Sequence, residues 1–215
     1  EQIMLFHLVK KDFLIVKKYV LIMLVAAIAI PPIMLWRAPE YGGVMGFILS
    51  VIFAVFMLLQ YVSLKEYQCP KASALLCSAP YPRRLLVLSK YIFCMLIYAI
   101  CCLIFGIETM VAPQLGALRL DALALMFLIT AIVVGLYLPT QYKLGYEKTK
   151  FAFVVIIMAS PVLTAALLKM EGMNFDALFT APPIFVYGGM ILAGIVFLII
   201  SACLSVKFYD KVDLA

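Results

Sequence analysis

Residues 65–90 read KEYQCPKASALLCSAPYPRRLLVLSK, and this charged run decides how the rest of the chain is arranged. It holds five of the seventeen lysines and arginines in the sequence. On either side of it lies an uncharged apolar segment, at 41–64 and at 91–107. A helix needs about 17–25 apolar residues to cross a bilayer, and both segments meet that length. The run is therefore predicted to be a loop between two membrane spans.

A short amphipathic helix is predicted inside this loop, at about 71–79. Small and apolar residues recur there at the spacing of one helix face, and they are Ala72, Leu75, Leu76 and Ala79. Pro70 suits the first turn of such a helix, and Pro80 and Pro82 end it. Because its apolar edge lies outside the membrane, we expect it to dock into a separate soluble protein. The alternative is a surface helix that covers the edge of the bilayer.

Long uncharged stretches continue along the whole chain. Between charged residues there are six of them, which predict spans at about 19–36, 44–64, 88–108, 120–140, 151–169 and 183–206. The sequence is 67% hydrophobic and 13% charged, whereas soluble domains are about 45–50% apolar and about 25% charged. The predicted fold class is therefore all-α, with residues 1–215 forming one polytopic membrane domain of six transmembrane helices.

The positive charges predict the orientation of these spans. The N-terminal arm, the 65–90 loop, the 143–150 loop and the C-terminal tail together carry fourteen of the seventeen Lys and Arg residues. Short loops rich in Lys and Arg stay in the cytoplasm, so we expect a multi-pass protein of the cell membrane with both termini cytoplasmic. The formal net charge of +6 follows from this topology, and no nucleic-acid partner is expected.

The N-terminal arm, with Met4 as the expected native start, is predicted to form an amphipathic helix over residues 4–18. Such a helix lies in the plane of the membrane surface. Its apolar side consists of Leu5, Leu8, Val9, Phe13 and Val16, and its basic side of His7, Lys10, Lys11, Lys17 and Lys18. Asp12 and Leu14 each lie on the wrong side of this pattern.

Prolines and glycines mark the first two spans. Pro31 and Pro32 are expected to kink the first helix or end it. Gly42 and Gly46, at the mouth of the second span, have the GxxxG spacing. That spacing suits either a close approach of two helices or a turn before the span.

Residues for catalysis or energy conversion are missing from the sequence. It has no GxxxxGK[ST] motif for ATP phosphates and no GxSxG, and His7 is its single histidine. No charged residue lies at the centre of a predicted span, where ion-coupled transporters need one. None of the six cysteines falls in a predicted outer loop, so we expect them to be reduced. We expect no enzyme activity, no catalytic or metal site and no cofactor in this chain, and any driving energy must come from a partner ATPase.

The segments between the spans resemble those of a known family. They are the basic start HLVKKDFLIVKK, the inner loop KASALLCSAPYPRRLLVLSKY, the second inner loop LPTQYKLGYEKTK and the short charged tail. Over nearly its whole length the chain resembles the small six-span permease subunits of ATP-binding-cassette (ABC) exporters of the type-2 family. Among them it is similar to permeases of phenol-soluble-modulin exporters. The EAA-x3-Gly motif of importer permeases does not occur in the inner loop.

The resemblance implies roles for three parts of the chain. It implies an elbow helix on the inner membrane surface, with Phe6, Val9, Lys10, Lys11 and Phe13. It implies a coupling helix that sits in a groove of the ATPase, with Lys71, Ala72, Leu75, Leu76 and Ala79. It also implies a lesser ATPase contact in the second inner loop, with Tyr142, Lys143, Tyr146 and Glu147.

The resemblance further implies partners and a substrate class. Two ABC ATPase subunits, which bind ATP and Mg, would join two permease chains, so this chain would form half of the translocation path within the membrane lipid. The second permease chain is either identical or a paralogue. The expected substrate is an amphipathic or antimicrobial-type peptide such as a phenol-soluble modulin, entering from the cytosol or from the inner leaflet. The alternative function is a membrane scaffold or regulatory subunit without transport activity.

Overall fold

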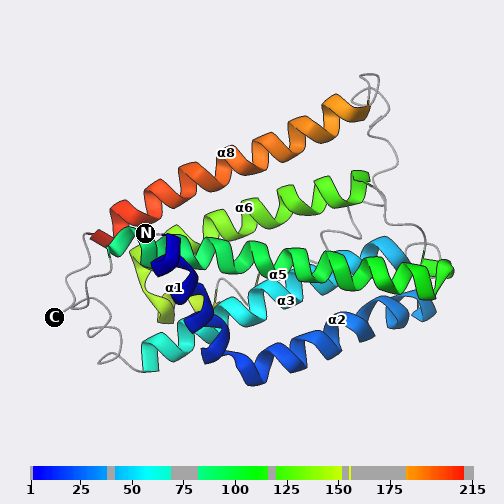
Figure 1. Cartoon of the computed structure of the whole chain (residues 1–215), viewed down its shortest axis with the longest axis horizontal. Helices are drawn as coiled ribbons and strands as arrows, with labels where there is room; N and C mark the ends of the chain where they lie inside the picture. Colours follow the sequence, from blue (N-terminus) through cyan, green and yellow to red (C-terminus); the bar gives the residue numbers. More distant parts are fainter. Residues whose placement is uncertain are drawn as a thin grey trace.

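The computed structural model describes residues 2–37, 42–68, 82–115, 120–151, 155 and 183–210. Within these residues all regular secondary structure is helical, and the long helices lie side by side as a bundle (Figure 1). In chain order the elements are α1 (Gln2–Ile15), α2 (Lys17–Arg37), α3 (Gly42–Gln68), α5 (Arg83–Val111), the 3-10 helix η1 (Pro113–Leu115), α6 (Leu120–Leu144) and α8 (Pro183–Asp210). The predicted all-helical class is confirmed for this part of the chain.

Five of these helices are long and apolar enough to cross a membrane, namely α2, α3, α5, α6 and α8. They cover the spans expected at 19–36, 44–64, 88–108, 120–140 and 183–206. Of the span expected at 151–169, only Phe151 and Val155 belong to the described residues. The chain is therefore a polytopic membrane protein, and the expected sixth span lies outside the described part.

The helices alternate in direction, so their ends gather at two opposite ends of the bundle (Figure 1). One end holds α1, the start of α5 and the C-terminal ends of α3, α6 and α8; we call it the charged end. The other end holds η1 and the starts of α3, α6 and α8; we call it the glycine end. Among the described lysines and arginines, Arg37 alone lies at the glycine end.

At the glycine end, α2 and α3 approach each other at backbone distance. A Cβ atom added to Gly46 of α3 would lie 2.6 Å from the Cα atom of Pro31 of α2. A Cβ atom added to Gly43 would lie 1.8 Å from the carbonyl oxygen of Leu115 in η1. The sequence left two roles open for the glycines in this region, a close approach of two helices or a turn before the span. Gly46 allows the close approach.

The expectation that Pro31 and Pro32 could end the first helix is wrong. Helix α2 continues through both prolines to Arg37. A proline inside a membrane helix removes a backbone hydrogen bond, but neighbouring helices can accommodate the freed groups. Here Pro31 is buried and packs against the bare backbone at Gly46, so tertiary packing compensates for the lost helical bond.

Helices α6 and α8 pack together through two glycine–phenylalanine contacts. The ring of Phe197 in α8 lies over Gly135 in α6, and the ring of Phe127 in α6 lies over Gly194 in α8. In both places an added Cβ atom would come closer than 3.0 Å to the ring, so a larger residue would force the ring to shift. Two reciprocal contacts fix the register of one helix against the other.

Helix α3 lies at the centre of the bundle, and α2 and α8 lie at its periphery. Of the α3 span 67% is buried, whereas only 17% of the α2 span and of the α8 span is buried. The fully buried side chains of α3 include Phe47, Val51, Leu58, Leu59 and Val62. The exposed sides of the peripheral helices carry large apolar residues, as expected for surfaces that face lipid or another membrane chain.

Candidate functional site

The amphipathic helix expected at 4–18 forms as α1 and packs mainly on α5 at the charged end. The helix is shorter than expected, because a turn at Val16 ends it and Lys17 and Lys18 begin α2. Its buried face contains Leu8 and Val9, and the ring of Phe13 meets that of Phe93 edge-on at 4.8 Å between centroids. Asp12, which broke the sequence pattern, is fully buried in the same face. A buried carboxylate needs a positive partner nearby, and the surroundings of Asp12 supply one.

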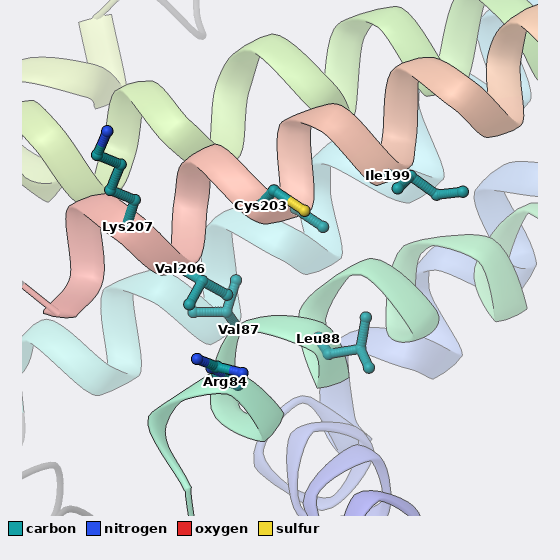
Figure 2. Close-up of a pocket in the computed structure, with 8 residues that line it drawn as sticks. Arg84, Val87, Leu88, Ile199, Cys203, Val206 and Lys207 are labelled. Carbon is teal, nitrogen blue, oxygen red and sulfur yellow. The ribbon is translucent and has the colours of Figure 1, made fainter.

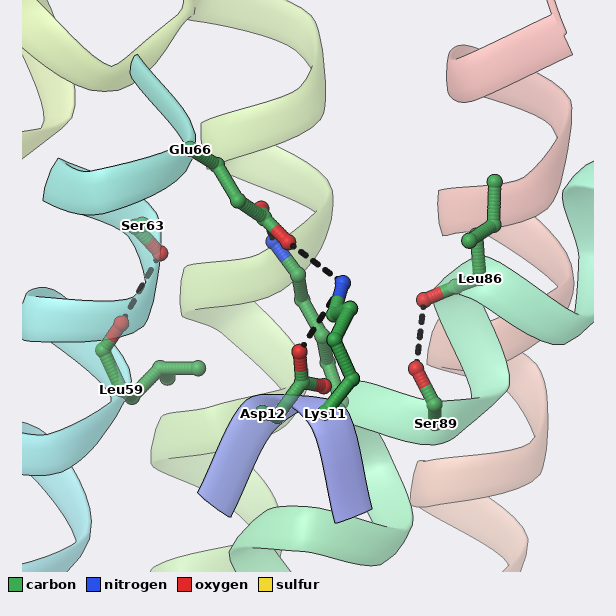
Figure 3. A network of polar contacts seen from close by, with 8 residues as sticks. Lys11, Asp12, Leu59, Ser63, Glu66, Leu86 and Ser89 are labelled. Atoms are coloured by element: carbon green, nitrogen blue, oxygen red, sulfur yellow. Dashed lines mark hydrogen bonds and ion pairs between the residues drawn. The ribbon is translucent and has the colours of Figure 1, made fainter. Parts of the chain in front are cut away.

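Four charged side chains from three helices meet at this position; we call Lys11, Asp12, Glu66 and Lys90 the charged cluster. The ammonium of Lys11 lies 3.1 Å from Oδ1 of Asp12 and 3.4 Å from Oε1 of Glu66. The ammonium of Lys90 donates a hydrogen bond to Oε2 of Glu66. Figure 3 shows Lys11 and Asp12 on α1 directed toward Glu66 on α3. Two positive and two negative charges balance, so the cluster is formally neutral.

The side chains of the charged cluster are partly or almost fully buried, so their ion pairs matter for the stability of the fold. The side chains of Asp12 and Lys90 are 1% and 7% exposed, and those of Lys11 and Glu66 are 27% and 28% exposed. Burial raises the pKa of the Asp12 carboxyl above its ordinary value of 3.8, and the neighbouring Lys11 ammonium opposes that shift. For the pair of Glu66 with the nearly inaccessible Lys90, removing one partner typically destabilises a protein by about 3–5 kcal/mol.

The cluster flanks the segment in which the coupling helix was predicted. Glu66 lies in the last turn of α3, and Lys90 lies near the start of α5. The expected coupling helix at 71–79, with Lys71, Ala72, Leu75, Leu76 and Ala79, lies outside the described residues. The hydrogen bond from Lys90 to Glu66 therefore joins the two helices from which that segment leaves and to which it returns.

Tyrosines and serines extend the cluster toward α6 and α8. The Lys90 ammonium lies 5.6 Å from the centre of the Tyr142 ring on α6, and Tyr142 in turn meets Tyr209 of α8 edge-on at 5.2 Å. The Tyr91 hydroxyl lies 2.6 Å from Oγ of Ser201 and 2.8 Å from Oγ of Ser205, both on α8. All five long helices are thus connected to one another near the charged end or through the core.

The first part of the expected second inner loop, with Tyr142 and Lys143, is not a loop but the end of α6, and Gly145 follows directly after this helix. Gly145 has a φ of 82°, a left-handed conformation that favours glycine, and its N–H donates to the Gln141 carbonyl at 2.9 Å. A helical segment that includes residues 146–151 follows. Its Glu147 accepts a hydrogen bond of 2.8 Å from the Tyr67 hydroxyl of α3, so the loop is fastened beside the end of α3.

The structure separates the residues expected in the second loop into inner and outer ones. Tyr142 faces the charged cluster, and Tyr146 packs on the Tyr67 ring at 5.5 Å. Lys143 and Glu147 are exposed at the surface, with the Lys143 ammonium 5.6 Å from the centre of the Phe208 ring. Lys143 and Glu147 are therefore the members of this set that a partner could reach. Their ATPase contact remains a prediction.

The residues expected in the elbow also divide into two groups. Val9 and Phe13 pack inward and Lys11 belongs to the charged cluster, whereas Phe6 and Lys10 are exposed. Sequence reasoning missed Asp12, Glu66 and Lys90 as one site. The signal was present, because a carboxylate on the apolar face of an amphipathic helix indicates a buried cation nearby.

Within the part of the chain that the structure describes, no group of three or more His, Cys, Asp or Glu side chains could hold a metal ion. The cysteines described there, Cys94, Cys101, Cys102 and Cys203, form no disulfide. What the charged cluster does chemically is hold helices together by ion pairs.

Comparison with known proteins gives one match. A family model described as "ABC-2 family transporter protein" matches residues 7–210, which is nearly the entire chain. No curated protein matches the sequence, and no solved structure matches the fold. The matched range begins within α1 and ends at the last residue of α8.

Proposed function

The chain belongs to the ABC-2 family of transporter proteins, and from that membership we propose that it is the permease subunit of an ABC exporter. In this role it forms half of the translocation path, and a separate ATPase subunit supplies the energy. The membrane location of the chain is consistent with this role, since five described helices are long and apolar enough to span a bilayer.

The observation that carries the proposal is the position of the charged cluster. Its ion pairs join α1, α3 and α5 next to the segment 69–81, which contains the proposed coupling helix. If the ATPase displaces that segment, the adjoining ends of α3 and α5 would move together, because Glu66 and Lys90 are hydrogen-bonded to each other. Lys11 would carry the same movement to α1. The cluster therefore suits the transmission of movement from an ATPase to the membrane helices.

The partners and the substrate follow from the proposed role. Two ATPase subunits with bound ATP and Mg would act on two permease chains, each with its own charged cluster. The proposed substrate is an amphipathic peptide of the phenol-soluble-modulin or antimicrobial type, which rests on the sequence resemblance of the inner loops. A role as a scaffold or regulatory subunit without transport is the alternative that the experiment below distinguishes.

The test is complex formation with the ABC ATPase encoded beside this chain, followed by ATPase activity with and without amphipathic peptide. A Leu75→Asp substitution places a charge in the proposed interface and should weaken the complex about 30-fold or more. The matched control is Leu120→Asp, because Leu120 is exposed at the glycine end, far from the proposed interface. This control should bind the ATPase like the wild type.

Four outcomes distinguish these possibilities. Loss of the complex in Leu75→Asp alone, with peptide-dependent ATPase activity in the wild type, supports both the permease role and the peptide substrate. A complex without any peptide response retains the permease role and rejects the peptide. A Leu75→Asp variant that binds as well as the control contradicts the coupling helix, and the absence of any complex favours the scaffold.

A further inference from the structure

A groove with a volume of about 570 Å³ lies between α5 and α8 on the side of the bundle near the charged end (Figure 2). Its walls come from the first turns of α5 and the last turns of α8. A volume of this size lies within the range of about 300–1,000 Å³ that is usual for small-molecule sites. The charged cluster does not line this groove, so the groove is a separate feature of the molecule.

The groove has a cationic end and an apolar wall. Of the eight described residues that line it, Arg84 and Lys207 are cations, six are uncharged, and none is acidic. The apolar wall continues from Val206 through Cys203 to Ile199 on α8, and along Leu88 on α5. Lys207 and Ile199 are eight positions apart on one helix, which corresponds to about 12 Å. The surface therefore changes from charged to apolar along the direction of the membrane normal.

Both cations are available to a ligand. Arg84 and Lys207 are exposed, and within the described chain neither has a carboxylate partner. A guanidinium binds a phosphate group through two parallel hydrogen bonds. Figure 2 shows the Lys207 ammonium directed away from Arg84, and the flexible stem of this exposed lysine lets it turn toward a phosphate at Arg84. Arg84 also lies in the first turn of α5, where unpaired backbone N–H groups favour an anion.

The depth of the groove in the bilayer matches a lipid. Its cationic end lies at the end of the bundle that the distribution of lysines and arginines predicts to be cytoplasmic. The cytoplasmic leaflet carries the anionic lipids, and basic pockets between membrane helices on that side bind their head groups. The apolar wall is exposed, with Leu88 and Ile199 at 39% and 58%, and it lies where acyl chains run.

We propose that this groove binds one anionic phospholipid of the cytoplasmic leaflet, with its phosphate at Arg84 and Lys207 and an acyl chain against Leu88, Cys203 and Ile199. The inference does not depend on transport, because it uses only the membrane location and the side chains of the groove. A bound lipid of this kind would fill the space between α5 and α8 and would add its own contacts to those of the Tyr91 hydroxyl with the serines of α8.

The test is native mass spectrometry of the purified full chain in detergent, titrated with phosphatidylglycerol or with phosphatidylcholine of identical acyl chains. The wild type should bind the first phosphatidylglycerol molecule about tenfold more tightly than phosphatidylcholine. The double variant Arg84→Gln/Lys207→Gln should lose this preference. The matched control Lys17→Gln/Lys18→Gln removes two exposed lysines from the same end of the molecule and should keep the preference.

A second variant tests the apolar wall independently of charge. Cys203→Trp places a large ring in the groove and should weaken the binding of both lipids while the two cations remain. Because the altered side chains are exposed, each variant should elute like the wild type, which is checked before titration. Equal lipid binding by Cys203→Trp and the wild type would overturn the proposal.

Other occupants give different results. Phosphatidylglycerol preference that persists in Arg84→Gln/Lys207→Gln would place the anionic lipid elsewhere. Competition by inorganic phosphate at the same site would identify a soluble anion as the ligand and overturn the lipid. Disulfide cross-linking between Cys203 residues of two copies, in a Cys69→Ser/Cys77→Ser background, would show that a second chain covers the groove, which also overturns it.

Discussion

The charged end and the glycine end of the bundle hold their helices together by different means. At the charged end, long side chains from α1, α3 and α5 meet in ion pairs, with Asp12 and Lys90 nearly inaccessible. At the glycine end, the backbones themselves touch, where Gly43 and Gly46 leave no room for a side chain. Flexible side chains can exchange partners, whereas a backbone contact breaks when a helix moves. The charged end, which lies next to the proposed ATPase contact, is therefore the end whose side-chain contacts can change when the helices move.

The largest effect is expected at the charged end, from Glu66→Gln. This substitution removes the shared acceptor of Lys11 and Lys90 and leaves a nearly buried ammonium without its carboxylate. Removing one partner of a buried pair costs about 3–5 kcal/mol, so the apparent melting temperature in detergent should fall strongly. The measurement is the temperature at which the monodisperse peak in size-exclusion chromatography disappears.

Two further variants sharpen this prediction. Glu66→Gln/Lys90→Met replaces both partners and should recover a large part of the lost stability, because no buried charge is left unpaired. Glu147→Gln changes an exposed carboxylate at the same end and should cost about 1 kcal/mol or less. If all three variants melt alike, the ion pairs of the cluster contribute nothing to the fold.

A smaller but clear effect is expected at the glycine end, from Gly43→Ala. The added Cβ atom would lie 1.8 Å from the Leu115 carbonyl oxygen, and since this is a backbone atom the helix end must shift. Overpacking of this kind typically costs about 1–3 kcal/mol. The matched control is Gly188→Ala in α8, where nothing lies within 4 Å of the added atom. The control should melt at or above the wild-type temperature, and an equal loss in both variants would contradict the close approach.

The smallest effect is expected from Asp12→Asn, and it should depend on pH. Burial raises the pKa of Asp12 above 3.8, so its carboxyl stabilises the folded state fully only below the unfolded pKa, and this contribution is lost as pH rises through the folded pKa. At pH 4 and below, Asp12→Asn should therefore have the same apparent melting temperature as the wild type. Toward neutral pH the melting temperature of the variant should rise above that of the wild type. If the difference in melting temperature between Asp12→Asn and the wild type does not change with pH, the Lys11 ammonium fully compensates the cost of burying the Asp12 carboxylate.

The sequence predicted the membrane helices well because their signal is local. An uncharged stretch long enough to cross a bilayer needs no partner to be recognised, and five expected spans coincide with α2, α3, α5, α6 and α8. The N-terminal helix was readable in part, since Leu8 and Val9 are buried as expected, although α1 ends at Ile15 and Lys17 and Lys18 belong to α2. For the same reason Asp12 stood out as an irregularity.

The candidate site could not be predicted because its members come from distant parts of the chain. Lys11 and Glu66 are 55 positions apart, and Glu66 and Lys90 are 24 apart, with the inner loop between them. No local pattern pairs these residues. Of the two roles expected for Pro31 and Pro32, ending the helix was wrong, and the contact of Pro31 with Gly46 of the neighbouring helix is one that no local pattern shows. Local sequence patterns predict the helices, whereas contacts between helices determine where those patterns fail.

The pairing of Glu66 with Lys90 has a consequence for how the protein enters the membrane during synthesis. Lys90 is nearly inaccessible although it lies at the beginning of a span, so α5 carries a charge that is costly to leave alone at the bilayer boundary. Its partner on α3 is made first and is already present when α5 leaves the ribosome. The two spans can then leave the translocon with Lys90 already neutralised by Glu66, so the order of synthesis along the chain sets the order in which this pair assembles.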